Sequence, residues 1–283
     1  MSPRATEPSL EGTFGARLER AFAAAGQLCV GIDPHPGLLS DWGLPDSAAG
    51  LRDFGLRVVE SAAGRAGIVK PQVSFYERHG SAGYAALEDV LAAARSAGLL
   101  VIADGKRGDV GSSVDAAADA WLTPGSPLEA DAMTAVAYQG LGSLDGVFER
   151  AALFGKGVFV LAATSNPEAF ETQTAMRADG LTVAAAVVAG AAVRNATASG
   201  ASADRLGSVG VVIGATIALG DFGLSAGSFA GMPILAPGFG YQGATIAQLP
   251  KLFGSAAQNV LVSASRSILS AGPGGLALSL IHI

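Results

Sequence analysis

Short apolar runs, each bounded by glycine, proline or polar residues, recur along the whole chain. Segments with apolar residues at helical spacing lie between them, as at 83–98 and 143–155. Strands that are continuously apolar and alternate with amphipathic helices are typical of a parallel sheet with both faces covered. The runs predicted to be strands are 28–33, 67–72, 99–104, 131–137, 157–163, 209–215, 232–238 and 259–265.

The number of runs favours a closed barrel over an open sheet. Eight strands alternating with helices is the count of a (β/α)8 barrel. A doubly wound sheet is the competitor, but no G-x-G-x-x-G follows the first run and no linker divides the chain. The sequence therefore predicts an α/β fold, a single-domain (β/α)8 TIM barrel over residues 13–277. The helical pattern at 14–26 precedes the first strand and is expected to cap the barrel bottom.

The two ends of the sequence are expected to lie outside this barrel. Residues 1–12 are polar and are predicted to be disordered. The last six residues, "LSLIHI" (278–283), are what CTGTCTCTTATACACATC encodes, which matches a transposase end sequence used in DNA library preparation. We therefore expect a non-native tail and assign no function to His282.

Composition narrows the class of protein. The chain has 283 residues and a net charge of −6, so it offers no general attraction to nucleic acid or anionic membranes. The longest hydrophobic stretch, 181–193, is too short to span a bilayer, and no basic segment precedes an apolar core at the N-terminus. A cytoplasmic enzyme is expected. With a single cysteine, Cys29, an internal disulfide is excluded. With only three histidines besides this cysteine, a dedicated zinc site is not expected.

The stretch "ADGKRGDVGSS" (103–113) crowds opposite charges at the end of the third run, although only 15% of the chain is charged. Buried charges are costly unless they are paired. Such a cluster is either a structural ion-pair network or a functional site.

Further charges follow the neighbouring runs. Asp33 ends the first run, Lys70 the second, and Asp104 and Lys106 the third, so all four can meet at the C-terminal mouth where such barrels do their chemistry. Because alternate strand residues share a face, Asp104 and Lys106 are expected to point the same way. Asp109 lies past a glycine, where the chain has turned, and need not face its own barrel. This concentration favours a functional site.

The last two strands end differently. Gln242 follows the seventh run in a glycine-rich turn, and Arg266 follows the eighth at a helix start. The loops after strands seven and eight are the usual phosphate-binding corner of this fold. We therefore expect a monophosphate substrate. The polar stretch 165–180 is longer than a usual strand-to-helix loop and is a candidate lid.

The stretches "CVGIDPHP", "KPQVSFYERHG", "DGKRGDVGSS", "AATSNPE", "APGFGYQGA" and "VSASRSIL", between residues 29 and 269, carry a family resemblance. The sequence resembles the orotidine 5′-phosphate decarboxylases, in the bacterial subgroup found in mycobacteria and their relatives. This resemblance implies decarboxylation of orotidine 5′-phosphate to uridine 5′-phosphate and CO2, the last step of de novo UMP biosynthesis. It also implies a homodimer with shared active sites and neither a metal nor a cofactor.

The resemblance implies a role for each matching residue. Lys106 matches the proton donor to C6, and Asp104 the carboxylate beside the departing CO2. Lys70 matches the lysine that links the acidic groups and the ribose hydroxyls. Asp109 matches the aspartate contributed by the other subunit, and Ser113 the hydroxyl of that subunit that contacts the ligand. Loss of CO2 from C6 leaves a carbanion without a conjugated electron sink, which a fixed ammonium can stabilise.

The remaining matches concern substrate binding. By resemblance, Asp33 contacts the ribose, Ser165 the pyrimidine, and Gln242 and Arg266 the phosphate. The sequence departs from the subgroup at Gly105, where alanine is usual, and in "TAVAYQG" after the fourth run, which lacks an expected Asn-Pro-Tyr.

Three other functions remain open at this stage. The sister 3-keto-L-gulonate 6-phosphate decarboxylases share D-x-K-x-x-D but use Mg2+ to stabilise an enediolate. A Schiff-base aldolase would use Lys70 or Lys106, and a non-catalytic nucleotide-binding barrel would bind without turnover. Outside the strand ends, Glu77 and Arg78 are expected to pair with each other at the surface.

Overall fold

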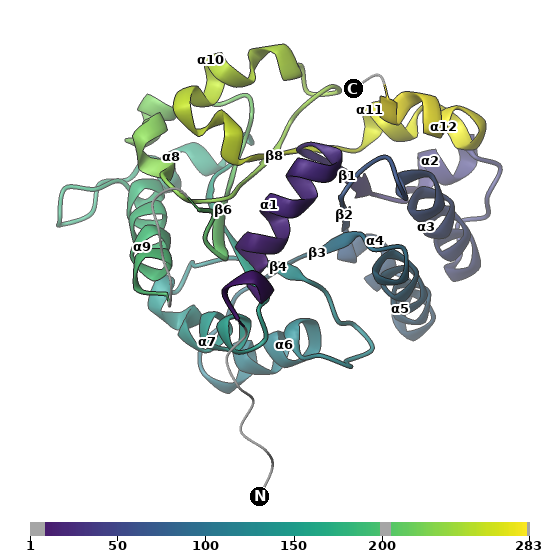
Figure 1. The fold of residues 1–283 in the computed structure, drawn as a ribbon, viewed down its shortest axis with the longest axis horizontal. Coiled ribbons are helices and arrows are strands. Elements are labelled where there is room, and N and C mark those ends of the chain that lie inside the picture. Colours follow the sequence, from purple (N-terminus) through teal and green to yellow (C-terminus); the bar gives the residue numbers. More distant parts are fainter. Residues whose placement is uncertain (1–8, 199–204, 282–283) are drawn as a thin grey trace, which may run out of the picture.

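Eight parallel strands close into a barrel in their sequence order, which confirms the predicted (β/α)8 fold (Figure 1). The computed structural model describes residues 9–198 and 205–281. The ring closes where β1 pairs with β8, with Leu28 opposite Val262. The strands are β1 (Leu28–Ile32), β2 (Ile68–Pro71), β3 (Leu100–Arg107), β4 (Ala132–Ala135), β5 (Gly157–Ala163), β6 (Val209–Ile213), β7 (Ile234–Pro237) and β8 (Val260–Ala264).

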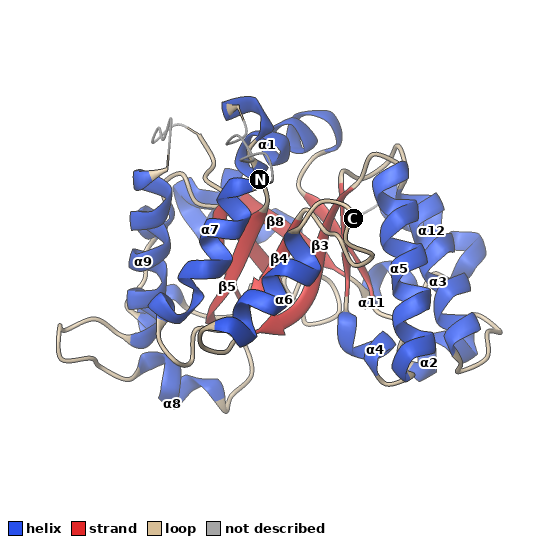
Figure 2. Ribbon diagram, turned by 90° about the horizontal axis from the view of Figure 1, so that it is seen from below, coloured by secondary structure: helices blue, strands red, loops and turns tan. Residues whose placement is uncertain are grey.

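Helices surround the barrel on its outer side (Figure 2). The α-helices are α1 (Phe14–Ala25), α2 (Pro36–Asp41), α3 (Ala48–Ala62), α4 (Val73–Glu77), α5 (Gly80–Ser96), α6 (Ser112–Leu122), α7 (Asp145–Leu153), α8 (Ala169–Thr174), α9 (Val183–Thr197), α10 (Leu249–Phe253), α11 (Arg266–Leu269) and α12 (Gly272–Ile281). Short 3-10 helices are η1 (Leu10–Gly12), η2 (Leu141–Leu144), η3 (Leu219–Phe222), η4 (Ala226–Phe229), η5 (Ile246–Gln248) and η6 (Gly254–Asn259).

Helix α1 closes the bottom of the barrel, as its position before the first strand predicts. It begins at Thr13, whose side chain caps the helix by accepting from the Ala16 N–H. Its Phe14 and Leu18 are fully buried in a core inside the barrel that also contains Cys29. A second, larger core lies between the strands and the outer helices. The barrel interior below the mouth is therefore filled by side chains, and the C-terminal ends of the strands surround one opening.

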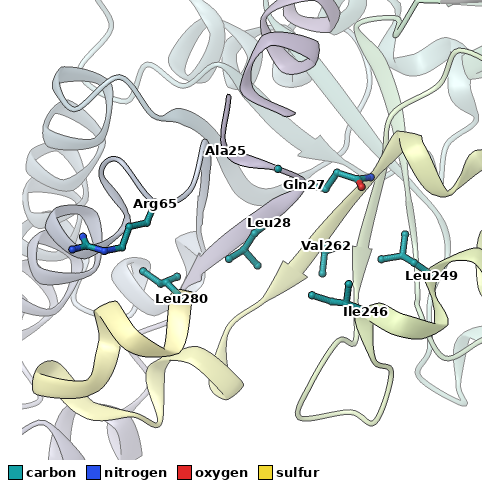
Figure 3. A pocket seen from close by; sticks show the side chains of 9 residues that line it. Ala25, Gln27, Leu28, Arg65, Ile246, Leu249, Val262 and Leu280 are labelled. Carbon is teal, nitrogen blue, oxygen red and sulfur yellow. The ribbon is translucent and has the colours of Figure 1, made fainter. Parts of the chain in front are cut away.

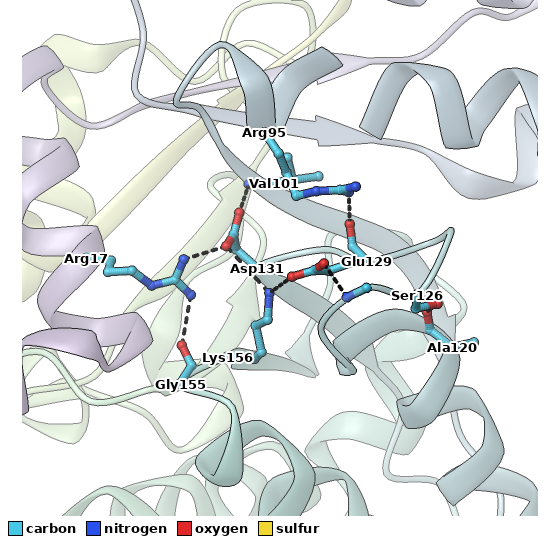
Figure 4. Close-up of polar contacts among 10 residues, drawn as sticks. Arg17, Arg95, Val101, Ala120, Ser126, Glu129, Asp131, Gly155 and Lys156 are labelled. Carbon is cyan, nitrogen blue, oxygen red and sulfur yellow. Dashed lines mark hydrogen bonds and ion pairs between the residues drawn. The ribbon is translucent and has the colours of Figure 1, made fainter. Parts of the chain in front are cut away.

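A network of charges fixes α1 to the strand starts (Figure 4). Arg17 bonds the carboxylate of Asp131 and donates to the Gly155 carbonyl at 2.8 Å. Asp131 also accepts from the Val101 N–H at 2.9 Å. Lys156 lies in the same network, 3.9 Å from Asp131, and is 5% exposed. Charges at this end bond to each other and to the backbone, so they hold the structure together.

The remaining expectations about the ends are resolved in part. Of the segment predicted to be disordered, residues 1–8 lie outside the described part, and Leu10–Gly12 form η1. His282 also lies outside it. Leu276 and Leu280 of α12 are buried in the outer core. Among the described residues, no helix combines the length and apolar character needed to cross a membrane.

A cavity of about 270 Å3 lies against β1 and β8, between α10 and α12 (Figure 3). Leu28, Val262 and Leu280 line it, together with Arg65. Val262 and Leu280 belong to the outer core. The charged strand-end residues do not line this cavity, so it is separate from the mouth.

Candidate active site

The carboxylate of Asp104 on β3 lies between two lysines at the mouth of the barrel. Lys70 Nζ on β2 donates to Asp104 Oδ2 at 2.7 Å, and Lys106 Nζ donates to Oδ1 at 2.7 Å. Adjacent strands thus bring together the three charges that the sequence places at their ends. Lys70 is 7% exposed, whereas the side chain of Lys106 is 44% exposed and reaches toward solvent.

Two neutral side chains complete the bonding of Asp104. Thr134 on β4 donates to Oδ1 at 3.0 Å. The amide of Gln72, at the end of β2, satisfies its neighbours when its nitrogen donates to Oδ2 at 2.7 Å and its oxygen faces Lys106 Nζ at 3.3 Å. Each carboxylate oxygen then accepts two hydrogen bonds, which uses the full capacity of a carboxylate. The Asp104 side chain is therefore fixed in one orientation.

The charges at this site keep each other ionised. Burial alone would raise the pKa of Asp104, but the ammonium groups of Lys70 and Lys106 outweigh it and lower that pKa well below its usual range. Burial would lower the pKa of Lys70, but Asp104 and Asp33 outweigh it and raise that pKa above its ordinary value. The site thus holds a carboxylate and a buried ammonium together without neutralising either.

An irregularity in the backbone of β3 sets the conformation of Lys106. The side chains of Asp104 and Lys106 form an ion pair, as expected for residues that share a face. However, the backbone between them does not have the regular alternation of a strand. The β3–β4 register shifts between Ala103 and Arg107, and Lys106 has φ of 48°. Among the described residues it is the one non-glycine residue with positive φ. This left-handed conformation costs about 1–2 kcal/mol and marks a locally strained position at the mouth.

Three buried polar atoms at the same mouth have no hydrogen-bond partner within the described part of the chain. They are Asp33 Oδ1 after β1, Ser265 Oγ after β8 and Ser267 Oγ in α11. Gly31 allows the close approach of β1 to this corner, because a Cβ there would lie 2.7 Å from the Ser265 Cβ. Buried polar groups without partners are rare in folded proteins. These atoms are available to a ligand.

The residues expected at the pyrimidine and phosphate lie side by side. Ser165 Oγ donates to Gln242 Oε1 at 3.4 Å, which joins the loops after β5 and β7. Arg266 stacks its guanidinium on the ring of Tyr241, 3.8 Å from the ring centre. Tyr241 is absent from the residues singled out in the sequence, although it directly precedes Gln242. The predicted lid contains α8.

Asp109 and Ser113 are not brought into the cluster of their own chain. Both are exposed, Asp109 in the segment that links β3 to α6 and Ser113 in the first turn of α6. The Asp109 carboxylate accepts from the adjacent Val110 N–H at 2.8 Å, and it forms no ion pair with any described residue. The expectation that Asp109 turns away from its own barrel is consistent with this geometry. Its role in a partner's site stays a prediction.

One expected ion pair is wrong. Glu77 bonds Arg107 and accepts from Tyr84 OH at 2.7 Å, whereas Arg78 pairs with Asp46. Burial would raise the pKa of Glu77, but Arg107 outweighs it and lowers that pKa. Neighbours in sequence point apart at the end of α4, so Glu77 meets a residue of β3 instead. This pair ties α4 to the residue after Lys106.

Two further residues of the site have a signal in the sequence. Thr134 is the one hydroxyl in the fourth run, and Gln72 follows the second strand directly. Over the residues that the structure describes, no group of three or more His, Cys, Asp or Glu side chains is arranged to hold a metal ion.

Comparison with known proteins shows the family to which the chain belongs. The model of the "Orotidine 5′-phosphate decarboxylase / HUMPS family" matches residues 26–279. The chain belongs to this family. The described site lies within the matched residues, so the resemblance inferred from its motifs is confirmed.

Relatives in the orotidine 5′-phosphate decarboxylase family match almost throughout. Proteins of that name from Salinispora arenicola and a Nocardioides species are 52% and 53% identical, over 94% and 90% of this chain and 93% and 91% of their own length. A crystal structure of a candidate orotidine 5′-phosphate decarboxylase from Streptomyces avermitilis superimposes with a TM-score of 0.90 at 45% identity, covering 100% of this chain and 96% of that one. The chain is therefore an enzyme of the carboxy-lyase class.

Proposed function

We propose that this enzyme converts orotidine 5′-phosphate to uridine 5′-phosphate and CO2, the last step of de novo UMP biosynthesis, without a metal or a cofactor. The observation that carries the proposal is one buried carboxylate held between two lysines, of which one is buried and the other opens toward the mouth. Family membership and relatives at about half identity support the same reaction.

The proposed mechanism uses the fixed charge of Lys106. The bond between C6 and the carboxylate breaks, its electron pair stays on C6, and CO2 departs. The adjacent ammonium of Lys106 offsets the developing negative charge and then transfers its proton to C6. Asp104 lies against the departing carboxylate, and the repulsion between them is relieved as CO2 leaves. Lys70 keeps Asp104 ionised and reaches the ribose hydroxyls.

The proposed binding roles follow the positions of the other residues. Asp33 contacts the ribose and Ser165 the pyrimidine, while Gln242 and Arg266 bind the phosphate. Contact with the remote phosphate supplies binding energy that closes the loops around the base. The unpartnered Asp33 Oδ1 supports a ligand contact at this corner.

We further propose a homodimer in which Asp109 and Ser113 of one subunit complete the site of the other. The exposed Val110, 55% accessible beside Asp109, supports a contact surface here. Subunits carrying Lys106→Ala and Asp109→Ala are each expected to be inactive and to regain partial activity when mixed. Verified heterodimers without any recovery would contradict a shared site. We expect the enzyme in the cytoplasm.

One assay tests the reaction itself. Loss of the ultraviolet absorbance of orotidine 5′-phosphate is expected to proceed in the presence of EDTA. Lys106→Ala should lower kcat by about 10²–10⁴-fold, the range typical of a proton-transferring group. Lys251→Ala, at an exposed lysine of α10, is the matched control and should leave the rate unchanged.

Each alternative gives a different result. Inhibition by EDTA would indicate the Mg2+-dependent sister reaction, and a borohydride-trapped adduct would indicate an aldolase. The raised pKa of Lys70 argues against its use in a Schiff base, which requires a neutral amine. Binding of uridine 5′-phosphate without release of CO2 from orotidine 5′-phosphate would indicate a non-catalytic barrel.

A further inference from the structure

Thr134 bonds both the carboxylate of Asp104 and the backbone of Lys106, the two residues of the proposed catalytic pair. Its Oγ1 donates to Asp104 Oδ1 at 3.0 Å and accepts from the Lys106 N–H at 2.9 Å. The side chain is buried on β4, with 1% of the residue exposed. A hydroxyl group has one proton to donate and can also accept hydrogen bonds, so Thr134 donates to Asp104 and accepts from Lys106 at the same time.

The acceptor contact replaces a regular sheet bond at the bulge. Between Ala103 and Arg107 the register of β3 on β4 shifts, and the backbone hydrogen bonding resumes where the Val136 N–H donates to the Arg107 carbonyl at 2.8 Å. The Lys106 N–H within this interval bonds the Thr134 side chain. Lys106 also holds φ of 48°, which its own side chain disfavours. Strained conformations persist when surrounding contacts over-determine them.

We propose that Thr134 is a positioning residue for decarboxylation. It holds Lys106 in its left-handed conformation, and it orients the Asp104 oxygen that accepts a hydrogen bond from the Lys106 ammonium. The inference rests on the proposed function. Thr134 fixes both ends of one ion pair from a neighbouring strand, so the ammonium stays where C6 is to be protonated. Loss of the hydroxyl leaves the partly buried Lys106 N–H without this acceptor and frees the Lys106 backbone to relax.

The experiment compares substitutions that separate the hydroxyl from the shape of the side chain. Thr134→Val keeps the branched shape but removes the hydroxyl, and Thr134→Ser keeps the hydroxyl. Thr123→Val is the matched control, because Thr123 Oγ1 is also buried but has no partner within the described part of the chain. For each variant, kcat and KM for orotidine 5′-phosphate and the Kd of uridine 5′-phosphate are measured.

Thr134→Val is expected to lower kcat by roughly tenfold to a hundredfold, the effect of a small misplacement of a reacting group. KM and the Kd of uridine 5′-phosphate should change by less than about threefold, because the ground-state contacts remain. Thr134→Ser and Thr123→Val should keep kcat within about threefold of the wild type. If the valine variant does not fold, Thr134→Ala replaces it in the comparison with serine.

The outcomes separate this inference from the function on which it rests. A wild-type enzyme without activity on orotidine 5′-phosphate would overturn the proposed function. An active wild type with equal kcat in Thr134→Val would overturn the positioning role alone. An equal loss in Thr134→Ser and Thr134→Val, or a loss confined to KM, would overturn it as well.

Discussion

The buried pair Lys70–Asp104 offers a direct test of whether the charges at the mouth are mutually dependent. Lys70→Met removes the ammonium at similar length, and Asp104→Asn removes the carboxylate charge but keeps polar atoms for Thr134. Each single change leaves a buried charge without its main partner. The double variant leaves neither. A double-mutant cycle therefore isolates the interaction between the two side chains.

The magnitude follows from the 2.7 Å separation of Lys70 Nζ and Asp104 Oδ2. At an effective dielectric constant of about 20, two unit charges at this distance attract by about 6 kcal/mol. Desolvation of the two groups together offsets about half of that attraction. Each single variant loses the whole attraction and recovers the desolvation of one group only, so it should lose about 4–5 kcal/mol of unfolding free energy. The double variant recovers the desolvation of both groups and should lose about 3 kcal/mol, well below the sum of the single losses, because replacing both charges is less costly than stranding one.

Urea unfolding at pH 7, followed by circular dichroism and tryptophan fluorescence at one protein concentration, measures the cycle. The control cycle uses Arg52→Met and Asp89→Asn, an exposed pair whose side chains are 49% and 52% accessible. Exposed pairs contribute about 0.2–1 kcal/mol, so this control should show little coupling. Additive losses at Lys70 and Asp104 would refute the reasoning, since independent effects mean that the two charges do not sustain each other.

Three further outcomes are expected. Because the pKa of Asp104 is lowered, this residue stabilises the fold above about pH 4, and the stabilisation is lost as the pH falls further. Because the pKa of Lys70 is raised, this residue stabilises the fold below about pH 10, and the stabilisation is lost as the pH rises further. Repeating the cycle from pH 3 to 11 should thus give constant coupling between about pH 5 and 9 and smaller coupling outside. Asp131→Asn should lower the free energy of unfolding in urea by about 2 kcal/mol and leave kcat unchanged, because the bond from Arg17 lies at the opposite end of the barrel. Arg266→Ala should weaken binding of uridine 5′-phosphate by roughly tenfold to a hundredfold in calorimetry but leave uridine binding unchanged, whereas equal loss for both would argue against a phosphate contact.

The strands were predictable because each is buried on both faces and therefore reads as an apolar run. The run at 28–33 matches β1, and the run at 157–163 matches β5 without a shift. Strand β3 extends to Arg107, beyond the expected end at Asp104, because the bulge lets it continue through charged residues. Apolar patterning carries no signal for such an extension.

The site was predictable to the extent that strand ends converge. Lys70, Asp104 and Lys106 meet because parallel neighbours bring their ends together. The contribution of Thr134 was not predictable in the same way, since it depends on the register between β3 and β4. Likewise, Glu77 could not be matched to Arg107 from spacing, because the two come from different elements.

The contrast between the two ends of the barrel bears on the choice between a structural network and a functional site. At the bottom, Asp131 is bonded by a side chain and a backbone N–H, and it locks α1 in place. At the mouth, the carboxylate of Asp104 accepts four hydrogen bonds, yet Asp33 and Ser265 each keep a buried oxygen without a partner in the described part of the chain. A purely structural network gains nothing from such atoms, which cost about 1–3 kcal/mol each. Their cost is offset if a polar ligand completes their bonding, and the strained Lys106 lies at that same mouth. The lower network also keeps one buried atom without a described partner, Arg17 Nε, but no strained residue lies in it. The strain at Lys106 together with the unpartnered oxygens therefore favours a ligand site at the mouth.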